Sequence, residues 1–315
     1  MRLCRFRHQG QSSVGFYDES GIVPLSDAAA AFQSTTGTAL DVATGDDLLE
    51  FLPPSGNSAE TARQLHQFIT TGNHSAGLRL SLSSVELLVP VPRPAKLFLL
   101  AGNYAAHIEE AGEKASERQE TFPYVFMKPP TTTLTDPGKP IRIPAVSPAH
   151  VDWELELAVV IGRVAKGVTE AEALKYVAGY TIINDISDRK FRPNPGRKPR
   201  ERDAFFDWLH GKWHDGFCPM GPCIASADAI PDPQKLPMQL RVNGKTFQDS
   251  TTAAQVFPVA AVIEFISSFV TLEPGDIIST GTPSGVGSTT GTFLRPGDRV
   301  DAFIEAIGTL SSPVE

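Results

Sequence analysis

The stretch with the clearest capacity for chemistry is VDWELELAVVIG, residues 151–162, where acidic residues alternate with apolar ones before the segment becomes wholly apolar. Because side chains alternate across a strand, Asp152, Glu154 and Glu156 are predicted to share one face. A buried, unpaired carboxylate is very costly in free energy, so these acids must be solvated, paired with cations or bound to a metal ion. This stretch alone does not show whether the carboxylates are solvated, paired or bound to a metal ion.

A further carboxylate, Asp185, directly follows the apolar run YTIIN, so it is expected at a strand end where a pocket can open. With Glu154 and Glu156 it would supply the oxygen ligands that hard divalent cations prefer. No His or Cys lies beside either cluster, which favours Mg²⁺ or Mn²⁺ over Zn²⁺. The alternative is a solvated acidic face, the common state of such residues.

His107 and Glu110 form the second candidate cluster. A helix is predicted over 104–118 with Asn103 as its N-cap, and residues three apart on a helix share a face. A carboxylate on one imidazole nitrogen raises the basicity of the other, so the pair can act as a general base. It can equally be an ordinary surface pair.

Two further segments could bind an anion. The loop STGTPSGVG, residues 279–287, has glycines whose backbone N–H groups a carboxylate can approach, and it lacks the Gly-Lys-Ser/Thr of a nucleotide-binding loop. The alternative is a tight turn that serves packing only. In HGKWHDGFCPMGPC, Lys212 is a mobile cation that could lie over an anionic substrate. The same segment contains four possible zinc ligands: His210, His214, Cys218 and Cys223. Zinc is not expected there, because the His residues precede the Cys residues and the glycines disfavour the helix that a His pair four residues apart needs.

The composition predicts a soluble globular protein: 315 residues, 41% hydrophobic and 20% charged, with no apolar run long enough to span a bilayer. A formal charge of −8 argues against bulk electrostatic binding to nucleic acid. Three cysteines without a CxxC pair, and an N-terminus without an apolar run, indicate a reducing, cytoplasmic setting. The predicted partners are a small molecule and another subunit, with neither nucleic acid nor membrane.

The order of elements predicts two parts. Residues 1–88 are expected to form a small accessory domain of short strands and one helix over 58–71. The prolines of VPVPRPAK make a stiff connector, so the second domain is placed at 89–315. Strands dominate it, and Asn243-Gly244 predicts a hairpin turn. The class is α+β and β-rich, because few helices are predicted there: 104–118, 170–176 and 258–269.

Seven motifs in order resemble the fumarylacetoacetate hydrolase family, in its shorter acylpyruvase-like branch, over about residues 96 to 308. They are AGNYAAHIEE, FMKPPTT, DWELELAVVIG, GYTIINDISDR, GKWHDGFCPMGP, VNGKTFQ and LEPGDIISTGTPSGVG. The resemblance implies a mixed β-roll or sandwich of that family's catalytic-domain type, a small variable domain ahead of it, and a homodimer.

The resemblance also implies a role for individual residues. A bound Mg²⁺ or Mn²⁺ would have three carboxylate ligands, Glu154, Glu156 and Asp185. The catalytic residues would be His107 and Glu110 on a lid, and Lys212. Lys128 in FMKPP would have a structural or pocket-edge role. Arg189 would bind substrate, and Gly281 with Thr282 would form a carboxylate-binding turn.

Two features depart from the family pattern. Arg192 stands where the family commonly has Gln in Arg-Asp-x-Gln, and seven of the fourteen residues from 189 to 202 are Arg or Lys. If Arg192 points inward, it would bind a second carboxylate at the far end of the substrate. The basic loop can instead be solvated or contact another subunit.

The activity implied is hydrolysis of a C–C bond in 2,4-dioxo acids, of acylpyruvate or fumarylpyruvate type, through a metal-stabilised enolate. His107, oriented by Glu110, would activate water, and Lys212 would add positive charge or a proton. One alternative is a decarboxylase or isomerase of 2-oxo or 2-hydroxydienoate acids in aromatic catabolism, which needs no attacking water. The other is a catalytically idle metal-binding homologue, against which the complete His–Glu pair argues.

Overall fold

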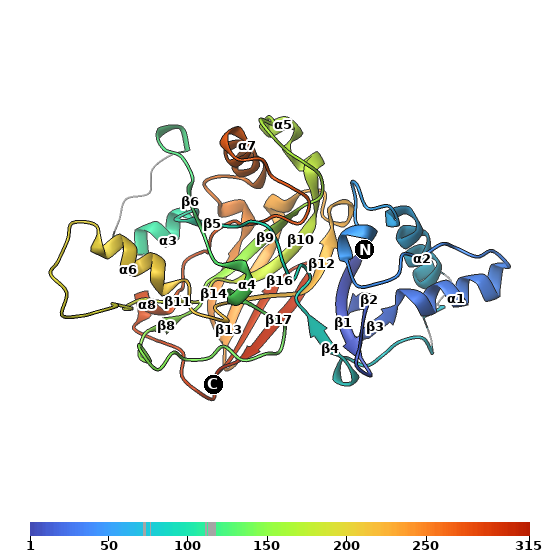
Figure 1. Cartoon of the computed structure of the whole chain (residues 1–315), viewed down its shortest axis with the longest axis horizontal. Helices are drawn as coiled ribbons and strands as arrows, with labels where there is room; N and C mark the ends of the chain where they lie inside the picture. Colours follow the sequence, from blue (N-terminus) through green and yellow to red (C-terminus); the bar gives the residue numbers. More distant parts are fainter. Residues whose placement is uncertain (72–73, 76, 111, 113–117) are drawn as a thin grey trace.

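The computed structural model describes residues 1–71, 74–75, 77–110, 112 and 118–315, and one large mixed sheet organises it (Figure 1). The strands of this sheet are β1 Arg2–His8, β2 Gln11–Asp18, β3 Gly21–Pro24, β4 Glu86–Leu88, β5 Leu97–Ala101, β6 Tyr124–Met127, β7 Leu134–Thr135, β9 Leu155–Ile161, β10 Val177–Asn184, β12 Cys218–Ser226 and β15 Ile277–Ser279. Within the described part of the chain, these 11 strands follow the order β3-β2-β1-β12-β10-β9-β15-β5-β6, with β4 paired to β1 and β7 to β12.

A second, antiparallel sheet contains β13 Pro237–Val242, β14 Lys245–Thr251, β16 Arg299–Ile304 and β17 Gly308–Pro313. Its strand order is β14-β13-β16-β17, and a separate pair joins β8 Val151–Asp152 to β11 Ser187–Asp188. The turn between β13 and β14 has positive φ at Asn243 (51°) and Gly244 (79°). The predicted hairpin is therefore confirmed.

Helices make up a minority of the described chain: α1 Leu25–Thr36, α2 Ala59–Thr71, α3 Ala105–Glu110, α4 Pro130–Thr133, α5 Glu170–Ala173, α6 Asp203–Gly211, α7 Val259–Phe269 and α8 Gly287–Thr290. The β-rich α+β class is confirmed. None of the helices in the described ranges combines the length and the apolar character that crossing a bilayer requires.

Alternation along β9 divides the core into two layers. Leu155, Leu157 and Val159 belong to a cluster that includes buried side chains of the second sheet. Ala158 and Val160 belong to a cluster on the other side, which includes buried side chains of α1 and α2. All five are fully buried, so β9 is covered on both faces, as its apolar run predicts.

The acidic segment is not one continuous strand, because β8 ends at Asp152 and β9 begins at Leu155. Trp153, in the gap, is fully buried and donates from its indole N–H to the Gly285 carbonyl oxygen at 3.2 Å. The break directs the Asp152 carboxylate toward the first backbone N–H groups of α8, at 2.6 and 2.9 Å. Asp152 and Glu154 nevertheless both pair with Arg189, so their carboxylates lie on the same side of the segment despite the break.

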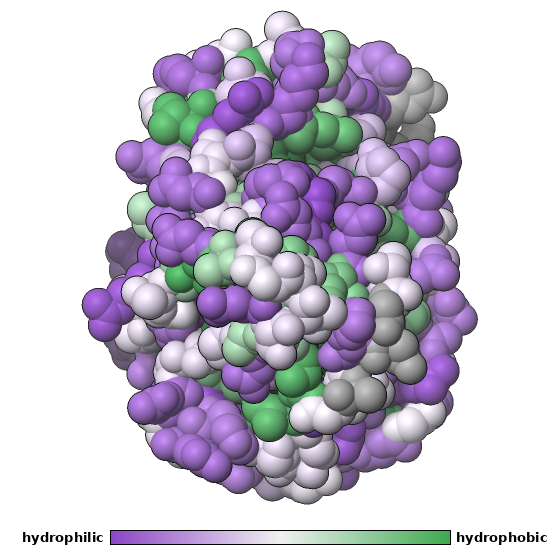
Figure 2. Space-filling model, turned by 90° about the vertical axis from the view of Figure 1, so that its right-hand side faces the viewer, coloured by the Kyte–Doolittle hydropathy of each residue, from purple (hydrophilic) through white to green (hydrophobic). Residues whose placement is uncertain are grey.

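The N-terminal segment shares the main sheet with the rest of the chain. β1 pairs antiparallel with β12, with Leu3 opposite Ile224. The sequence predicts one helix here and the structure has two, α1 and α2, at the right of Figure 1. The alanine-rich sequence of α1 has high helix propensity. The face that this segment presents is largely hydrophilic, with hydrophobic residues in small separate areas (Figure 2). The division at residue 88 stays a prediction.

Two helices differ from the sequence prediction. The helix expected over 104–118 is described as α3 over Ala105–Glu110; Ala111 and residues 113–117 lie outside the described residues, and Arg118 begins a 3₁₀ turn. α6 was not among the helices predicted from the sequence, and Gly211 is its last residue. A Cβ atom there would meet the Asp188 carbonyl oxygen at 2.3 Å, so the close approach of two backbones requires glycine.

Asn103 connects two segments near the end of β5 and does not cap α3. Its side-chain amide donates to the carbonyl oxygens of Phe257 (3.1 Å) and Thr280 (2.8 Å), and its Oδ1 accepts from the Phe257 N–H at 2.8 Å. The residue is buried, so these bonds are made away from water. Asn103 thus joins the end of β15 to the segment before α7, and the N-cap prediction is wrong.

Replacing Asn103 by Ala is expected to lower the free energy of unfolding by about 3 kcal/mol, because three buried backbone groups lose their partner. Urea denaturation of the metal-free protein measures this. Asn57→Ala is the control: Asn57 is exposed and makes one side-chain contact of 3.3 Å, so its loss should stay within about 0.5 kcal/mol. Equal losses in the two variants would contradict the role of Asn103.

Candidate active site

A cavity of about 200 Å³ lies where β5, α3 and α6 approach the start of β9. Three larger hollows elsewhere, of about 280, 360 and 500 Å³, contain none of the predicted site residues. The small cavity brings five of the predicted site residues together from separate segments. It is lined by Leu100, Ala101, Gly102, His107, Ile108, Glu154, Arg189, Trp208, Lys212 and Thr282.

Three carboxylates converge beside this cavity, as the sequence predicts. One oxygen each from Glu154, Glu156 and Asp185 lies within 4.8 Å of the others, and all three residues are buried. Strand pairing accounts for this arrangement, because β9 and β10 are antiparallel neighbours and the Asp185 N–H donates to the Glu154 carbonyl oxygen at 2.8 Å. Acids from two strands are thereby held at one place.

The Glu156 side chain tests whether this cluster fits a metal ion. Its Oε2 accepts from the Ser279 hydroxyl at 2.6 Å and the Gly281 N–H at 2.9 Å. Its Oε1 is buried and has no hydrogen-bond partner within the described part of the chain. Burial, followed by the charges of Asp185 and Glu154, raises the pKa of Glu156 well above its usual value. A divalent cation would satisfy the free oxygen and relieve this repulsion, so the residues fit Mg²⁺ or Mn²⁺.

Two cations flank the carboxylates. Lys212 donates from Nζ to Glu154 Oε2 at 2.7 Å and Asp185 Oδ2 at 2.6 Å. Arg189 pairs with Glu154 at 2.6 Å and with Asp152 at 2.8 Å. Burial alone raises the pKa of Glu154, but the Lys212 and Arg189 charges outweigh it and lower this pKa. Burial lowers the pKa of Lys212, yet the two carboxylates raise it overall, so Lys212 stays charged.

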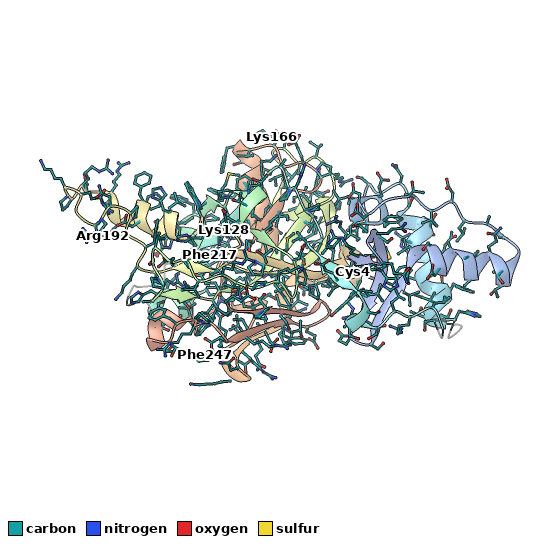
Figure 3. All side chains as sticks on the ribbon, turned by 60° about the horizontal axis from the view of Figure 1, so that its bottom comes forward. Cys4, Lys128, Lys166, Arg192, Phe217 and Phe247 are labelled. Carbon is teal, nitrogen blue, oxygen red and sulfur yellow. The ribbon has the colours of Figure 1, made fainter. Side chains whose placement is uncertain are left out.

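Lys128 is buried behind the cluster and has a more direct role than the sequence indicates. Its Nζ forms an ion pair with Asp185 and donates to the carbonyl oxygens of Ile186 (2.9 Å) and Phe217 (2.6 Å). Figure 3 shows Lys128 and Phe217 near the middle of the molecule. Lys128 therefore fixes the Asp185 carboxylate in place. Its position directly after the strand β6 was the available sequence signal.

The His107–Glu110 pair forms as predicted, with Nδ1 of His107 2.8 Å from Glu110 Oε1. The Glu110 carboxylate also accepts from the Gly285 N–H and, at 3.3 Å, from the Thr289 hydroxyl. Glu110 thus anchors α3 to the loop 279–287. His107 lines the cavity, and donation from Nδ1 to Glu110 leaves Nε2 free to accept a proton.

The predicted anion-binding turn serves the carboxylate cluster. The Gly281 N–H donates to Glu156, and the Thr282 hydroxyl donates to the Leu155 carbonyl oxygen at 3.0 Å while accepting from Gln248. Gly281 has φ of 87°, and a Cβ there would lie 2.9 Å from the Asn103 Cβ. Thr282 also lines the cavity. Binding of a substrate carboxylate by this turn stays a prediction.

Arg192 is not brought to the cavity. It is exposed, lies on the loop at the left of Figure 3, and is absent from the cavity lining. Elsewhere in the loop, Arg197 pairs with Asp203 and Asp207 of α6. Substrate binding by Arg192 stays a prediction. The zinc alternative gains no support, because the carboxylate cluster is the only group of metal-ligand geometry among the described residues.

Trp208 of α6 is a cavity residue that the sequence analysis missed. Its ring centroid lies 5.0 Å from that of Phe126 in β6. The Lys212 ammonium lies 5.4 Å from the Phe126 centroid and 5.8 Å from that of Trp208. Two aromatic faces therefore border this cation and stabilise its charge. Trp208 could have been found only by predicting α6, which places it one turn before Lys212.

Comparisons with known proteins agree with this geometry. The family model described as fumarylacetoacetate (FAA) hydrolase, C-terminal, matches residues 96–315. The 2,4-didehydro-3-deoxy-L-rhamnonate hydrolase of Sphingomonas sp. (strain SKA58) is 34% identical, over 98% of this chain and 94% of its own. An oxaloacetate tautomerase of Bacillus subtilis (strain 168) is 37% identical, over 85% of this chain and 86% of its own. Among solved structures, maleylpyruvate hydrolase from Sphingobium sp. SYK-6, in complex with manganese (II) ion and pyruvate, is 30% identical in sequence. The match covers 100% of this chain and 98% of that one, with a TM-score of 0.69.

Glu156→Gln is expected to change how the stability of the metal-free protein depends on pH. Because the pKa of Glu156 is raised on folding, its stabilising contribution is present below about pH 4.3 and is lost as pH rises through the folded-state pKa. Glutamine carries no charge, so the melting temperature of the variant should exceed that of the wild type by a margin that grows as pH rises from about pH 5 toward the raised folded-state pKa of Glu156.

Thermal melts of chelator-treated protein measure this margin. Glu172→Gln, at an exposed glutamate paired with Lys175, is the control and should show no pH-dependent margin. Added Mn²⁺ should raise the melting temperature of the wild type and have little effect on Glu156→Gln. A margin that is constant with pH would contradict the raised pKa.

Proposed function

The chain belongs to the fumarylacetoacetate hydrolase family, and we propose that it is a metal-dependent hydrolase that cleaves a C–C bond in 2,4-dioxo acids of acylpyruvate or fumarylpyruvate type. The observation that carries this proposal is the His107–Glu110 pair, held at 2.8 Å on the wall of the cavity beside the carboxylate cluster. Hydrolysis requires a base for water, and a protein that only binds a metal does not. The full-length match to a hydrolase gives further support.

Glu154, Glu156 and Asp185 would hold Mg²⁺ or Mn²⁺, which when bound supplies a Lewis acid for the carboxylate and 2-oxo oxygens of the substrate. Lys212, beside these carboxylates on the cavity wall, adds a positive charge where negative charge develops on the substrate. Leu100 and Ile108 provide apolar walls that limit the access of bulk water.

His107 performs the proton transfer. Its Nε2 takes a proton from water, and the hydroxide attacks the carbonyl carbon at C4 of the substrate. The C3–C4 bond breaks, its electron pair stays on C3, and a carboxylic acid and the enolate of pyruvate or a substituted relative are released. Glu110 stabilises the imidazolium through Nδ1 until the proton is returned to C3.

Tautomerisation of a 2-oxo dicarboxylate is the second candidate. It needs only the movement of a proton between C3 and the 2-oxo oxygen, which His107 can carry out without an attacking water. A relative that is 37% identical over 85% of the chain is an oxaloacetate tautomerase, which favours this candidate specifically. The two reactions use the same residues and differ in their products.

His107→Gln is expected to lower kcat for pyruvate release from an acylpyruvate by at least about 100-fold, because the general base is lost. Mn²⁺ binding should be unchanged, since His107 is not among the clustered carboxylates. A coupled assay for pyruvate and calorimetric titration of Mn²⁺ measure the two effects. His66→Gln, in α2 and outside the cavity, is the control and should retain full activity.

The same assays decide between the candidates. If the wild type releases no pyruvate from acylpyruvates but accelerates keto–enol conversion of oxaloacetate, followed by ultraviolet absorbance, the tautomerase replaces the hydrolase. If His107→Gln retains hydrolysis, the role of the base is wrong.

We also propose that two copies of the chain associate through an aromatic band, which consists of Phe122, Tyr124, Phe126, Phe205, Phe206, Trp208, Trp213, Phe265 and Phe269. Ring contacts link its members on α7, β6 and α6, with centroids 5.0 to 6.1 Å apart for Phe122–Phe265, Phe122–Tyr124 and Phe126–Trp208. Six of these side chains are between 39% and 62% exposed. At about 200 Å² each, they present roughly 600 Å² of apolar surface.

That area approaches the roughly 800 Å² per partner of a standard interface and equals the largest patches of typical monomers. Interfaces between identical subunits are more apolar than transient ones, which suits a surface with this many exposed aromatic side chains. The opposite end of the molecule, in Figure 2, carries only small separate hydrophobic areas. These observations favour a second copy as the partner.

A Phe122→Glu/Phe205→Glu double variant is expected to be monomeric where the wild type is dimeric, because burying two carboxylates in an apolar interface is unfavourable. Light scattering after size-exclusion chromatography measures the mass. Phe303→Glu is the matched control, since Phe303 is 39% exposed on β16 and outside the band. A monomeric wild type, or a dimer lost only in Phe303→Glu, would show that the band is not the interface.

A further inference from the structure

The two cations of the cavity, Arg189 and Lys212, lie on segments that dock onto each other. Arg189 directly follows β11, which ends at Asp188, and Lys212 directly follows α6, which ends at Gly211. The backbone of Gly211 contacts the Asp188 carbonyl closely enough that a Cβ would lie 2.3 Å from that oxygen. The positions of the two cations are therefore coupled.

A second contact joins these segments through their side chains. His214 Nε2 lies 3.5 Å from Asp188 Oδ2, and within the described ranges each of these buried atoms has no hydrogen-bond partner. The other oxygen, Asp188 Oδ1, accepts from the Ser147 hydroxyl at 2.9 Å and the Lys190 N–H at 3.3 Å. Asp188 is thus held in place with one oxygen directed at the imidazole.

The imidazole is held by aromatic rings. The His214 centroid lies 4.7 Å from that of Phe191 and 4.9 Å from that of Phe217. The preceding residue, Trp213, donates from its indole N–H to the Met127 carbonyl oxygen at 2.9 Å. The segment after Lys212 is therefore attached on one side to β6, and His214 faces Asp188 on the other.

We propose that His214 is a positioning residue, whose Nε2–H donates to Asp188 and so fixes the Lys212 ammonium at the carboxylates. The separation of 3.5 Å exceeds a normal hydrogen bond, and an approach of a few tenths of an ångström closes it and satisfies two buried atoms. The role of Lys212 in this inference rests on the proposed function. His214 itself does not line the cavity.

Two substitutions separate the hydrogen bond from the packing of the ring. His214→Phe keeps an aromatic ring between Phe191 and Phe217 but removes the donor. His214→Gln keeps an N–H donor near the position of Nε2 but removes the ring. His66→Phe is the matched control, because His66 packs on the ring of Phe16 in the N-terminal segment and is outside the cavity.

If His214 positions Lys212, His214→Phe should lower kcat about 10-fold with KM within about 2-fold, which corresponds to the loss of one charge-assisted contact in the transition state. His214→Gln should recover kcat to within about 3-fold of the wild type although it melts at a lower temperature than His214→Phe. His66→Phe should leave kcat unchanged. If kcat follows the melting temperature across the variants instead, His214 serves packing alone.

The hydrogen bond has a readout that does not depend on turnover. Nuclear magnetic resonance of ¹⁵N-histidine-labelled protein should show an imidazole Nε2–H signal protected from exchange with solvent, and His214→Phe should remove it. Absence of a protected signal in the wild type would overturn the pairing. Inactivity of the wild type toward every 2-oxo acid would refute the role given to Lys212 and the proposed function, while the signal would still report the bond.

Discussion

The mutual repulsion of three buried carboxylates is the constraint on which the rest of the site depends. One oxygen from each of Glu154, Glu156 and Asp185 lies within 4.8 Å of the others, and all three side chains are almost fully buried. Such a cluster is stable only if cations and donors surround it. Lys212 and Lys128 contact it from two directions, and a metal ion would complete the compensation at the free oxygen of Glu156.

The fold places those compensating groups by joining distant segments at the ends of central strands. Because β9 lies between β10 and β15, Glu156 receives donors from Ser279 and Gly281 at the end of β15, while the end of β10 supplies Asp185. Asn103 ties the end of β15 to the segment before α7. Buried backbone bonds therefore fix the carboxylates, and helix α3 is anchored separately through Glu110.

What the sequence predicted correctly is local or periodic. Alternation in the segment 151–162 predicts Glu154 and Glu156 on one face, and spacing on a helix predicts the His107–Glu110 pair. The misses involve partners far along the chain. Trp153 interrupts the strand because its indole donates to Gly285, the unpredicted helix α6 ends where Gly211 meets Asp188, and Asn103 finds partners beyond residue 250. No local pattern contains that information, since tertiary contacts override propensity.

Helix α6 connects the chemistry of the cavity with the outer surface. Trp208 forms part of the cavity wall, Lys212 follows the last turn, and Phe205 and Phe206 are exposed in the aromatic band. A displacement of this helix would therefore also displace the Lys212 ammonium, which contacts the carboxylates. Because Gly211 leaves no space between α6 and Asp188, the helix cannot shift without moving β11 and Arg189 with it. Packing around α6 thus sets the placement of both cations, and through them the positive charge on the cavity wall.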